Sequence, residues 1–250
     1  MKNISELRQD LVSGDWVVIA TGRAKRPHDF LLHKRPAFRQ PKETCPFEAV
    51  MPGAHARDAL PGKDSQKHWW VEAIPNKYPA FSHGQCASFS RQGPYTFAGG
   101  SGAHELVVTR DHTRSFARMS SKEAALVFLM YQNRFHALKK DRCVRYISLF
   151  HNHGRLAGAS LAHPHSQIIA LPVIPPQVSV SLAGSARHFK KEKTCVHCVL
   201  LAFELRVRSR IVWENDRFVA LTPFASRTAF EVRVFPQHHQ SHFEERASDD

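Results

Sequence analysis

The sequence predicts an α+β protein that contains one complete and one incomplete copy of a repeated unit. Segments of strand length recur along the chain, one long segment has helical spacing, and the order of motifs in the first part returns in the second. The chain has 250 residues, of which 42% are hydrophobic, so it can bury a sizeable core in one large or two smaller domains.

The first part is expected to alternate strands with long loops. Apolar and β-branched residues predict strands at residues 15–20, 69–74 and 105–109. Residues 31–67 and 82–102 are rich in Pro, Gly and polar residues, and we expect them to be loops.

The clearest helix follows Ser120. Ser120 and Glu123 fit a capping box, in which the Ser caps the helix and the Glu three residues later reaches back. Apolar residues then recur at helical spacing to about Lys140, and a strand is expected at residues 146–150.

The second part is expected to begin with helices and to continue with strands. The chain looks helical after Pro176, with an interruption near Gly184, and again at residues 195–207. The segments expected to be strands are residues 211–214, 218–222 and 230–235. Residues 241–250 resemble the approach to a further helix.

An internal repeat organises these elements. The first copy has these motifs in order: Cys45-x-x-Glu48, Glu105-Leu106-Val107-Val108, His112, the capped helix and His163-Pro164-His165. The second copy has Cys195-x-x-Cys198, Glu231-Val232-Arg233-Val234 and the pair His238 and His239, and it stops there. We therefore expect a first unit at residues 1–174 and a truncated second unit at residues 175–250.

Charge and hydropathy indicate which kinds of molecule this protein can bind. A formal net charge of +13 and 17 His favour anionic partners, such as nucleic acid or phosphorylated small molecules. The Lys and Arg are scattered and no aromatic-plus-basic motif occurs, which argues against nucleic acid. No apolar run is long enough for a membrane helix, and the N-terminus lacks the apolar core of a signal peptide, so no membrane partner and a cytoplasmic location are expected.

The histidine-rich run at residues 163–167 is the main candidate for chemistry. In an extended chain, side chains alternate between faces, so His163, His165 and Gln167 share one face, while Ile168 and Ala170 take the other. Neutral imidazole is a competent nucleophile near pH 7. Gln167 can donate to a phosphate oxygen. We expect nucleotidyl or phosphoryl transfer through a covalent His165 intermediate.

Two other segments suit anions and metals. Arg23 and Arg26 lie in a turn-like basic segment that could clamp phosphate, although a solvated basic loop explains the same residues. The chain has five Cys, an odd number, and the Cys195-x-x-Cys198 pair favours metal ligation over a disulfide framework in a reducing compartment.

Four motifs in sequence resemble the galactose-1-phosphate uridylyltransferase family, the transferase branch of the histidine triad superfamily. They are Gly22-Arg23-Ala24-Lys25-Arg26-Pro27, Pro75-Asn76-Lys77-Tyr78-Pro79-Ala80, Gly158-Ala159-Ser160 and His163-Pro164-His165-Ser166-Gln167. The resemblance implies histidine triad-like units with an antiparallel sheet flanked by helices, in two tandem copies of which the second is truncated. It also implies a homodimer.

The resemblance further implies a ping-pong uridylyltransferase. His165 would attack the α-phosphorus of UDP-glucose, release glucose 1-phosphate and pass the uridylyl group to a hexose 1-phosphate, galactose 1-phosphate. Gln167 and Ser160 would hold phosphate oxygens. The positions expected to contact the nucleotide sugar are Arg23, Arg26, Asn76, Lys77, Asn152, Gly154 and Gly158.

Zinc is the implied cofactor, at two sites. The first would be held by Cys45, His112 and His163, with Glu48 in place of a second Cys. A carboxylate can bind zinc, and such a site would anchor the strand of His165. The second would use Cys195 and Cys198 with His239, whereas ungapped alignment of the repeat would choose His238; a fourth ligand is expected beyond Asp250.

Three alternatives remain open. A sibling enzyme such as an ADP-sugar phosphorylase would keep the His165 intermediate and change the base and the acceptor. A truncated, inactive protein that binds nucleotide or zinc would form no adduct. A nucleic-acid-binding protein would lose affinity steeply with salt.

Overall fold

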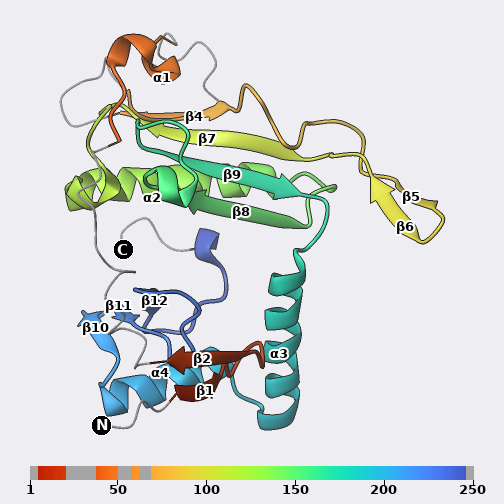
Figure 1. The fold of residues 1–250 in the computed structure, drawn as a ribbon, viewed down its shortest axis with the longest axis vertical. Coiled ribbons are helices and arrows are strands. Elements are labelled where there is room, and N and C mark those ends of the chain that lie inside the picture. The colour runs from red at the N-terminus through yellow and green to blue at the C-terminus, as the bar shows by residue number, and fades with distance from the viewer. Residues whose placement is uncertain (1–4, 21–37, 50–57, 62–68, 246–250) are drawn as a thin grey trace. The chain divides into compact units, whose positions relative to one another are not determined.

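The computed structural model describes residues 5–20, 38–49, 58–61 and 69–245 (Figure 1). The chain forms two compact units. We call residues 36–174 with 242–250 the central unit, and residues 1–35 with 175–241 the flanking unit. The division of the chain into histidine triad-like copies at residue 174 remains a prediction.

The central unit is built on a five-stranded antiparallel sheet, with the strand order β3-β4-β7-β9-β8. The strands are β3 (Asp58–Pro61), β4 (Trp69–Pro75), β7 (Ala103–Thr109), β8 (Tyr146–His151) and β9 (His165–Leu171). Strand β9 lies between β7 and β8, with Leu106 opposite Gln167 on one side and Phe150 opposite Gln167 on the other. The strand that carries the histidine run is therefore interior to the sheet.

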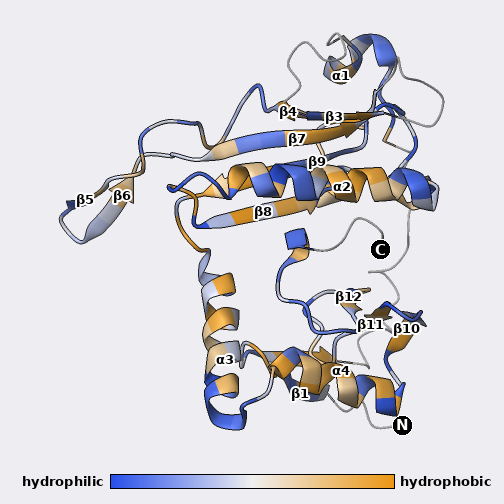
Figure 2. Ribbon diagram, turned by 180° about the vertical axis from the view of Figure 1, so that it is seen from behind, coloured by the Kyte–Doolittle hydropathy of each residue, from blue (hydrophilic) through white to orange (hydrophobic). Residues whose placement is uncertain are grey.

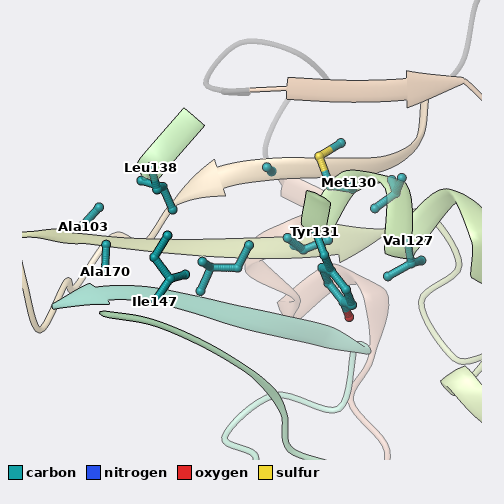
Figure 3. Packing of buried hydrophobic residues seen from close by; sticks show 11 residues of the cluster. Ala103, Val127, Met130, Tyr131, Leu138, Ile147 and Ala170 are labelled. Carbon is teal, nitrogen blue, oxygen red and sulfur yellow. The ribbon is translucent and has the colours of Figure 1, made fainter. Parts of the chain in front are cut away.

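Helix α2 (Ser121–Leu138) covers one face of this sheet and confirms the predicted capped helix. Both hydrogen bonds of the capping box are present: the Ser120 hydroxyl accepts from the Glu123 backbone, and the Glu123 carboxylate accepts from the Ser120 backbone. In Figure 2, α2 carries both hydrophobic and hydrophilic residues along its length, as expected of a helix with one buried side. Its buried residues Val127, Met130 and Tyr131 pack with those of the sheet (Figure 3).

Two of the predicted loops contain regular structure, which corrects the prediction. The segment at residues 31–67 includes the short helices η2 (Lys42–Thr44) and α1 (Pro46–Ala49) and the strand β3. The segment at residues 82–102 includes the hairpin β5 (Phe89–Gln92) and β6 (Tyr95–Ala98). Gly93 has a φ of 56° in this turn, a conformation that glycine adopts without strain. Other short helices among the described residues are η3 (Phe116–Arg118), η4 (Arg155–Ala157) and η5 (Phe243–Glu245).

A disulfide joins Cys86 to Cys143 within the central unit. The Cys195-x-x-Cys198 pair is expected to bind metal rather than to form a disulfide. In the structure, Cys45, Cys195 and Cys198 form no disulfide. The disulfide links the segment before β5 to the segment between α2 and β8, and sequence spacing gave no indication of it.

The described residues of the flanking unit form two small antiparallel sheets and two helices. The first sheet pairs β1 (Ser5–Gln9) with β2 (Trp16–Ala20), and the second has the order β10-β11-β12. Its other elements are α3 (Pro176–Glu192), α4 (Val196–Val207), β10 (Ile211–Glu214), β11 (Phe218–Leu221) and β12 (Arg233–Pro236). Strand β12 begins at Arg233 rather than at residue 230 as predicted, and Phe230 has a φ of 61°, which is not a strand conformation.

Helix α3 is continuous, so the predicted interruption at Gly184 is wrong. Gly184 is buried against the backbone of Val12, and a Cβ atom at this position would lie 1.8 Å from the Val12 carbonyl oxygen. The glycine therefore allows close approach of the helix to the turn between β1 and β2. Among the described residues, no helix is long and apolar enough to cross a membrane.

Candidate active site and metal centres

Strand β9 separates the candidate catalytic residues from the core as predicted. His165 and Gln167 are partly exposed, whereas Ser166, Ile168 and Ala170 are buried. Ile168 and Ala170 belong to the core cluster that packs with α2. His165 and Gln167 therefore lie on the sheet face opposite α2, which we call the open face.

Backbone geometry defines which nitrogen of His165 is available. The His165 Nδ1 atom lies 2.9 Å from the His163 carbonyl oxygen. A carbonyl oxygen can only accept, so Nδ1 carries the proton and donates it. In the neutral ring, Nε2 then holds the unshared electron pair that a nucleophile needs. The Phe47 ring stands edge-on to the imidazole, with the ring centroids 5.3 Å apart.

A buried cluster of Cys45, His112 and His163 lies next to His165, since His163 is two residues before it. The His112 Nε2 donates to the Gln40 carbonyl oxygen at 2.6 Å, and the His163 Nε2 donates to the Thr109 carbonyl oxygen at 2.6 Å. Both Nδ1 atoms consequently present electron pairs, and they face each other at 3.1 Å. Such an arrangement is stable when a cation lies between them, and hydrogen bonds from the distal nitrogen to a carbonyl are typical of metal-bound histidines.

The separations between donor atoms fit a tetrahedral metal ion. In a zinc site, two nitrogen ligands lie about 3.4 Å apart and a nitrogen and a sulfur about 3.6 Å apart. The Cys45 Sγ lies 3.6 Å from the His163 Nδ1. The Glu48 Oε1 lies 3.3 Å from the His112 Nδ1 and 3.7 Å from the His163 Nδ1. Glu48 therefore lies near both imidazoles, whereas the group whose donor atoms all lie within 4.8 Å of one another is Cys45, His112 and His163.

Burial lowers the pKa of His163, and the neighbouring His112 acts in the same direction, although the hydrogen bond to Thr109 opposes it. A lowered pKa keeps the imidazole neutral near pH 7, and a neutral imidazole is the form that binds metal.

The second cysteine pair also meets a histidine. The potential ligand atoms of Cys195, Cys198 and His239 all lie within 4.8 Å of one another, and the Cys198 Sγ is 3.2 Å from the His239 Nδ1. Cys195 is the N-cap residue of α4. His239, rather than its neighbour His238, belongs to the group. Desolvation raises the pKa of the Cys198 thiol, and its hydrogen bond with Cys195 adds to this effect.

Asn76 and Gln167 both contact His104, a residue that the sequence did not indicate as functional. The His104 Nε2 lies 2.9 Å from the Gln167 Oε1 and 3.1 Å from the Asn76 Nδ2. The Asn76 Oδ1 accepts a hydrogen bond from the Tyr78 backbone at 2.9 Å. The structure thus brings Asn76, an expected nucleotide contact, and Gln167, expected to hold a phosphate oxygen, together through His104.

The glycine-bearing loop before β9 holds the other expected contacts. Gly154 has a φ of 78° and Gly158 a φ of 84°, and a Cβ atom on Gly158 would lie 3.7 Å from the Asn152 side chain. Ser160 is exposed at the end of this loop.

Lys77 is the remaining expected contact that the structure describes. The Lys77 ammonium lies 5.7 Å from the centroid of the Tyr78 ring. Among the residues that the structure describes, neither Lys77 nor Ser160 forms a hydrogen bond with His165 or Gln167. Arg23 and Arg26 lie outside the described residues.

A second network supports β9 from the α2 side. The Tyr131 hydroxyl lies 2.5 Å from the Ser166 hydroxyl, which lies 3.0 Å from the His151 Nδ1. Burial raises the pKa of Tyr131 and lowers that of His151. Strand alternation places His104 and Leu106 on one face of β7, but only the pairing of β7 with β9 shows that this face carries Gln167.

Comparison with known proteins identifies relatives over almost the whole chain. A family model described as galactose-1-phosphate uridyl transferase, N-terminal domain, matches residues 1–175. An ADP-glucose phosphorylase of Arabidopsis thaliana is 32% identical over 242 residues, which cover 95% of this chain and 67% of the relative. A galactose-1-phosphate uridylyltransferase of Thermotoga maritima is 28% identical over 239 residues, which cover 94% and 68%.

Solved structures agree with the sequence matches. The crystal structure of an ADP-glucose phosphorylase from Arabidopsis thaliana with bound ADP-glucose has a TM-score of 0.75 and 29% identity, and covers 98% of this chain and 72% of that chain. A uridylyltransferase structure has a TM-score of 0.68 and 25% identity, and covers 98% and 70%.

The α+β fold and these likenesses define a nucleotidyltransferase-type protein of the histidine triad superfamily. The chain belongs to the galactose-1-phosphate uridylyltransferase family.

Proposed function

We propose that this chain transfers a nucleotidyl group from a nucleotide sugar through a covalent intermediate on His165. The observation that carries the proposal is the hydrogen bond from His165 Nδ1 to the His163 carbonyl oxygen at 2.9 Å. It directs the electron pair to Nε2 and fixes the ring on the open face of the sheet. No separate base is needed, because the attacking nitrogen carries no proton.

The reaction balances in two steps. In the first, the His165 Nε2 attacks the α-phosphorus, a phosphorus–nitrogen bond forms, and the bond to the bridging oxygen breaks to release a sugar 1-phosphate. In the second, a phosphate oxygen of the acceptor attacks the same phosphorus and the phosphorus–nitrogen bond breaks. The leaving groups are phosphate oxygens and need no strong general acid. Gln167 donates to a nonbridging oxygen where negative charge develops.

We propose zinc as the ion of the first metal centre, held by Cys45, Glu48, His112 and His163. When bound, zinc ties these four side chains together as a structural cross-link. His163 supplies both a ligand and the carbonyl that orients His165, so the proposed site fixes the residue on which the nucleophile depends. We propose Cys195, Cys198 and His239 as ligands of a second zinc ion.

Two donors are candidates. The higher identity and TM-score of the ADP-glucose phosphorylase favour an ADP-sugar as donor, with inorganic phosphate as acceptor. The family model and the Thermotoga maritima relative favour UDP-glucose as donor, with galactose 1-phosphate as acceptor. Both use the same intermediate.

The flanking unit supports a proposal of tandem copies. The order β10-β11-β12 repeats the antiparallel order β3-β4-β7, and each sheet is preceded by a helix that follows a candidate metal-binding cysteine. We propose that residues 175–250 form a partial second histidine triad-like unit. We also propose that the chain forms a homodimer, and sedimentation analysis would test this oligomeric state.

The test is to incubate the purified chain separately with UDP-glucose and ADP-glucose and to measure its intact mass. A uridylyl or adenylyl adduct identifies the donor, and adding inorganic phosphate or galactose 1-phosphate then identifies the acceptor that removes it. His165→Ala is the test variant and His83→Ala, at an exposed loop position, is the matched control. An adduct that persists in His165→Ala contradicts the proposal, as does the absence of an adduct with both donors.

A further inference from the structure

His104 lies on β7, where its side chain faces the same side of the sheet as Gln167. Its neighbours Ala103 and Val107 are in the core that packs with α2, so alternation places His104 and Leu106 on the open face. His104 is half-buried and stands between the Asn76 turn and strand β9. None of the expected catalytic or nucleotide-binding roles includes this residue.

The protonation of His104 follows from a backbone donor. The Ala80 N–H donates to the His104 Nδ1 at 3.1 Å. A backbone amide can only donate, so Nδ1 is an unprotonated acceptor, and the single proton of the neutral ring is on Nε2. A doubly protonated ring would place two donors against each other at this contact. The Nε2–H therefore donates to the Gln167 Oε1 at 2.9 Å.

The same reasoning orients both neighbouring amides. The Tyr78 N–H donates to the Asn76 Oδ1, which leaves the Asn76 NH₂ group 3.1 Å from the His104 Nε2. Because the Nε2 proton points to Gln167, this contact is not a hydrogen bond in the Nε2–H form. The Gln167 oxygen is occupied by His104, so its NH₂ group is the part left for a ligand. An amide turned the other way would present an oxygen to phosphate, and two acceptors would repel each other.

We propose that His104 is a positioning residue that locks the Gln167 side chain with its NH₂ group toward the transferred phosphate. The inference rests on the proposed function, because the phosphate is that of the nucleotide attached to His165. A locked donor needs no reorganisation as charge develops on the phosphate oxygens. His104 thus connects the turn at residues 76–80 to Gln167 on strand β9 through two hydrogen bonds.

The test is a double-mutant cycle on the single-turnover rate of His165 nucleotidylation. His104→Phe removes both hydrogen bonds and keeps a planar ring, and Gln167→Met removes the amide and keeps its length. We expect each variant to slow the reaction about 10- to 100-fold and the double variant to be no slower than the slower single variant, because both remove the same oriented donor. His104→Gln, which keeps an N–H donor, should recover part of the rate. His83→Phe is the matched control.

A second measurement does not depend on activity. Two-bond ¹H–¹⁵N correlation spectra report which nitrogen of a neutral histidine carries the proton, and His104→Phe assigns the signal. We expect the Nε2–H form, and a shift of the Gln167 NH₂ signals in His104→Phe but not in His83→Phe. An Nδ1–H form, or multiplicative rate losses in the cycle, would overturn the proposal. Absence of any adduct on the wild-type chain would reject the proposed function. The tautomer of His104 and the Gln167 NH₂ signals would still show whether His104 orients Gln167.

Discussion

Removal of the zinc ion proposed for Cys45, Glu48, His112 and His163 should destabilise the central unit by a measurable amount. Zinc at 100 times its dissociation constant adds about 2.7 kcal/mol to the stability of a protein that binds it only when folded. The central unit spans residues 36–174 and 242–250, and at this size 1 kcal/mol corresponds to about 2–4 °C in melting temperature. We therefore expect chelation to lower the melting temperature by about 5–11 °C.

The assay combines calorimetry with metal analysis in a Cys195→Ser, Cys198→Ser background, so that the second cluster does not contribute. Glu48→Ala should weaken zinc binding, because the Glu48 carboxylate lies within 3.3 and 3.7 Å of the two Nδ1 atoms. Glu43→Ala, at an exposed position in the same segment, is the control. An unchanged melting temperature after chelation, or full zinc content with unchanged affinity in Glu48→Ala, would refute the reasoning.

Three further predictions concern stability, each measured by urea unfolding. Arg134→Met should lower the free energy of unfolding by about 3–5 kcal/mol, because Arg134 makes two hydrogen bonds of 2.8 and 2.9 Å to the buried Glu105 carboxylate. A decrease below about 1 kcal/mol would show that the carboxylate finds another partner. Gly184→Ala should destabilise by about 1–3 kcal/mol despite the higher helix propensity of Ala, because the new methyl group meets the Val12 carbonyl oxygen; stabilisation would contradict that close approach. Ser120→Ala should cost about 1 kcal/mol through loss of the capping box, and an unchanged midpoint would count against that cap.

Sequence patterns predicted those helices and strands whose capping residues or alternation lie within the element itself. Helix α2 has a complete capping box and helical spacing, and β9 has a strict alternation of buried and partly exposed residues. The sequence therefore indicated both the helix and the face on which His165 and Gln167 lie.

Long-range contacts account for most of what the sequence did not reveal. The short strand β3 is stabilised by pairing with β4, and the hairpin β5–β6 lies in a segment whose Gly and Pro content suggested a loop. Gly184 looked like a helix breaker because its partner, Val12, is distant in sequence. The contact of His104 with Gln167 joins residues 63 positions apart, and only the sheet register brings them together.

The most direct test of a covalent His165 intermediate is a chase experiment on the isolated adduct. The chain is incubated with the reactive nucleotide sugar, which carries a label in its nucleotidyl group, and is then freed of small molecules. One portion is digested to map the modified peptide. A second portion is mixed with glucose 1-phosphate. We predict that the label lies on the peptide that contains His165 and that glucose 1-phosphate removes it and regenerates the nucleotide sugar. Label on another residue, or an adduct that glucose 1-phosphate cannot discharge, would contradict the account.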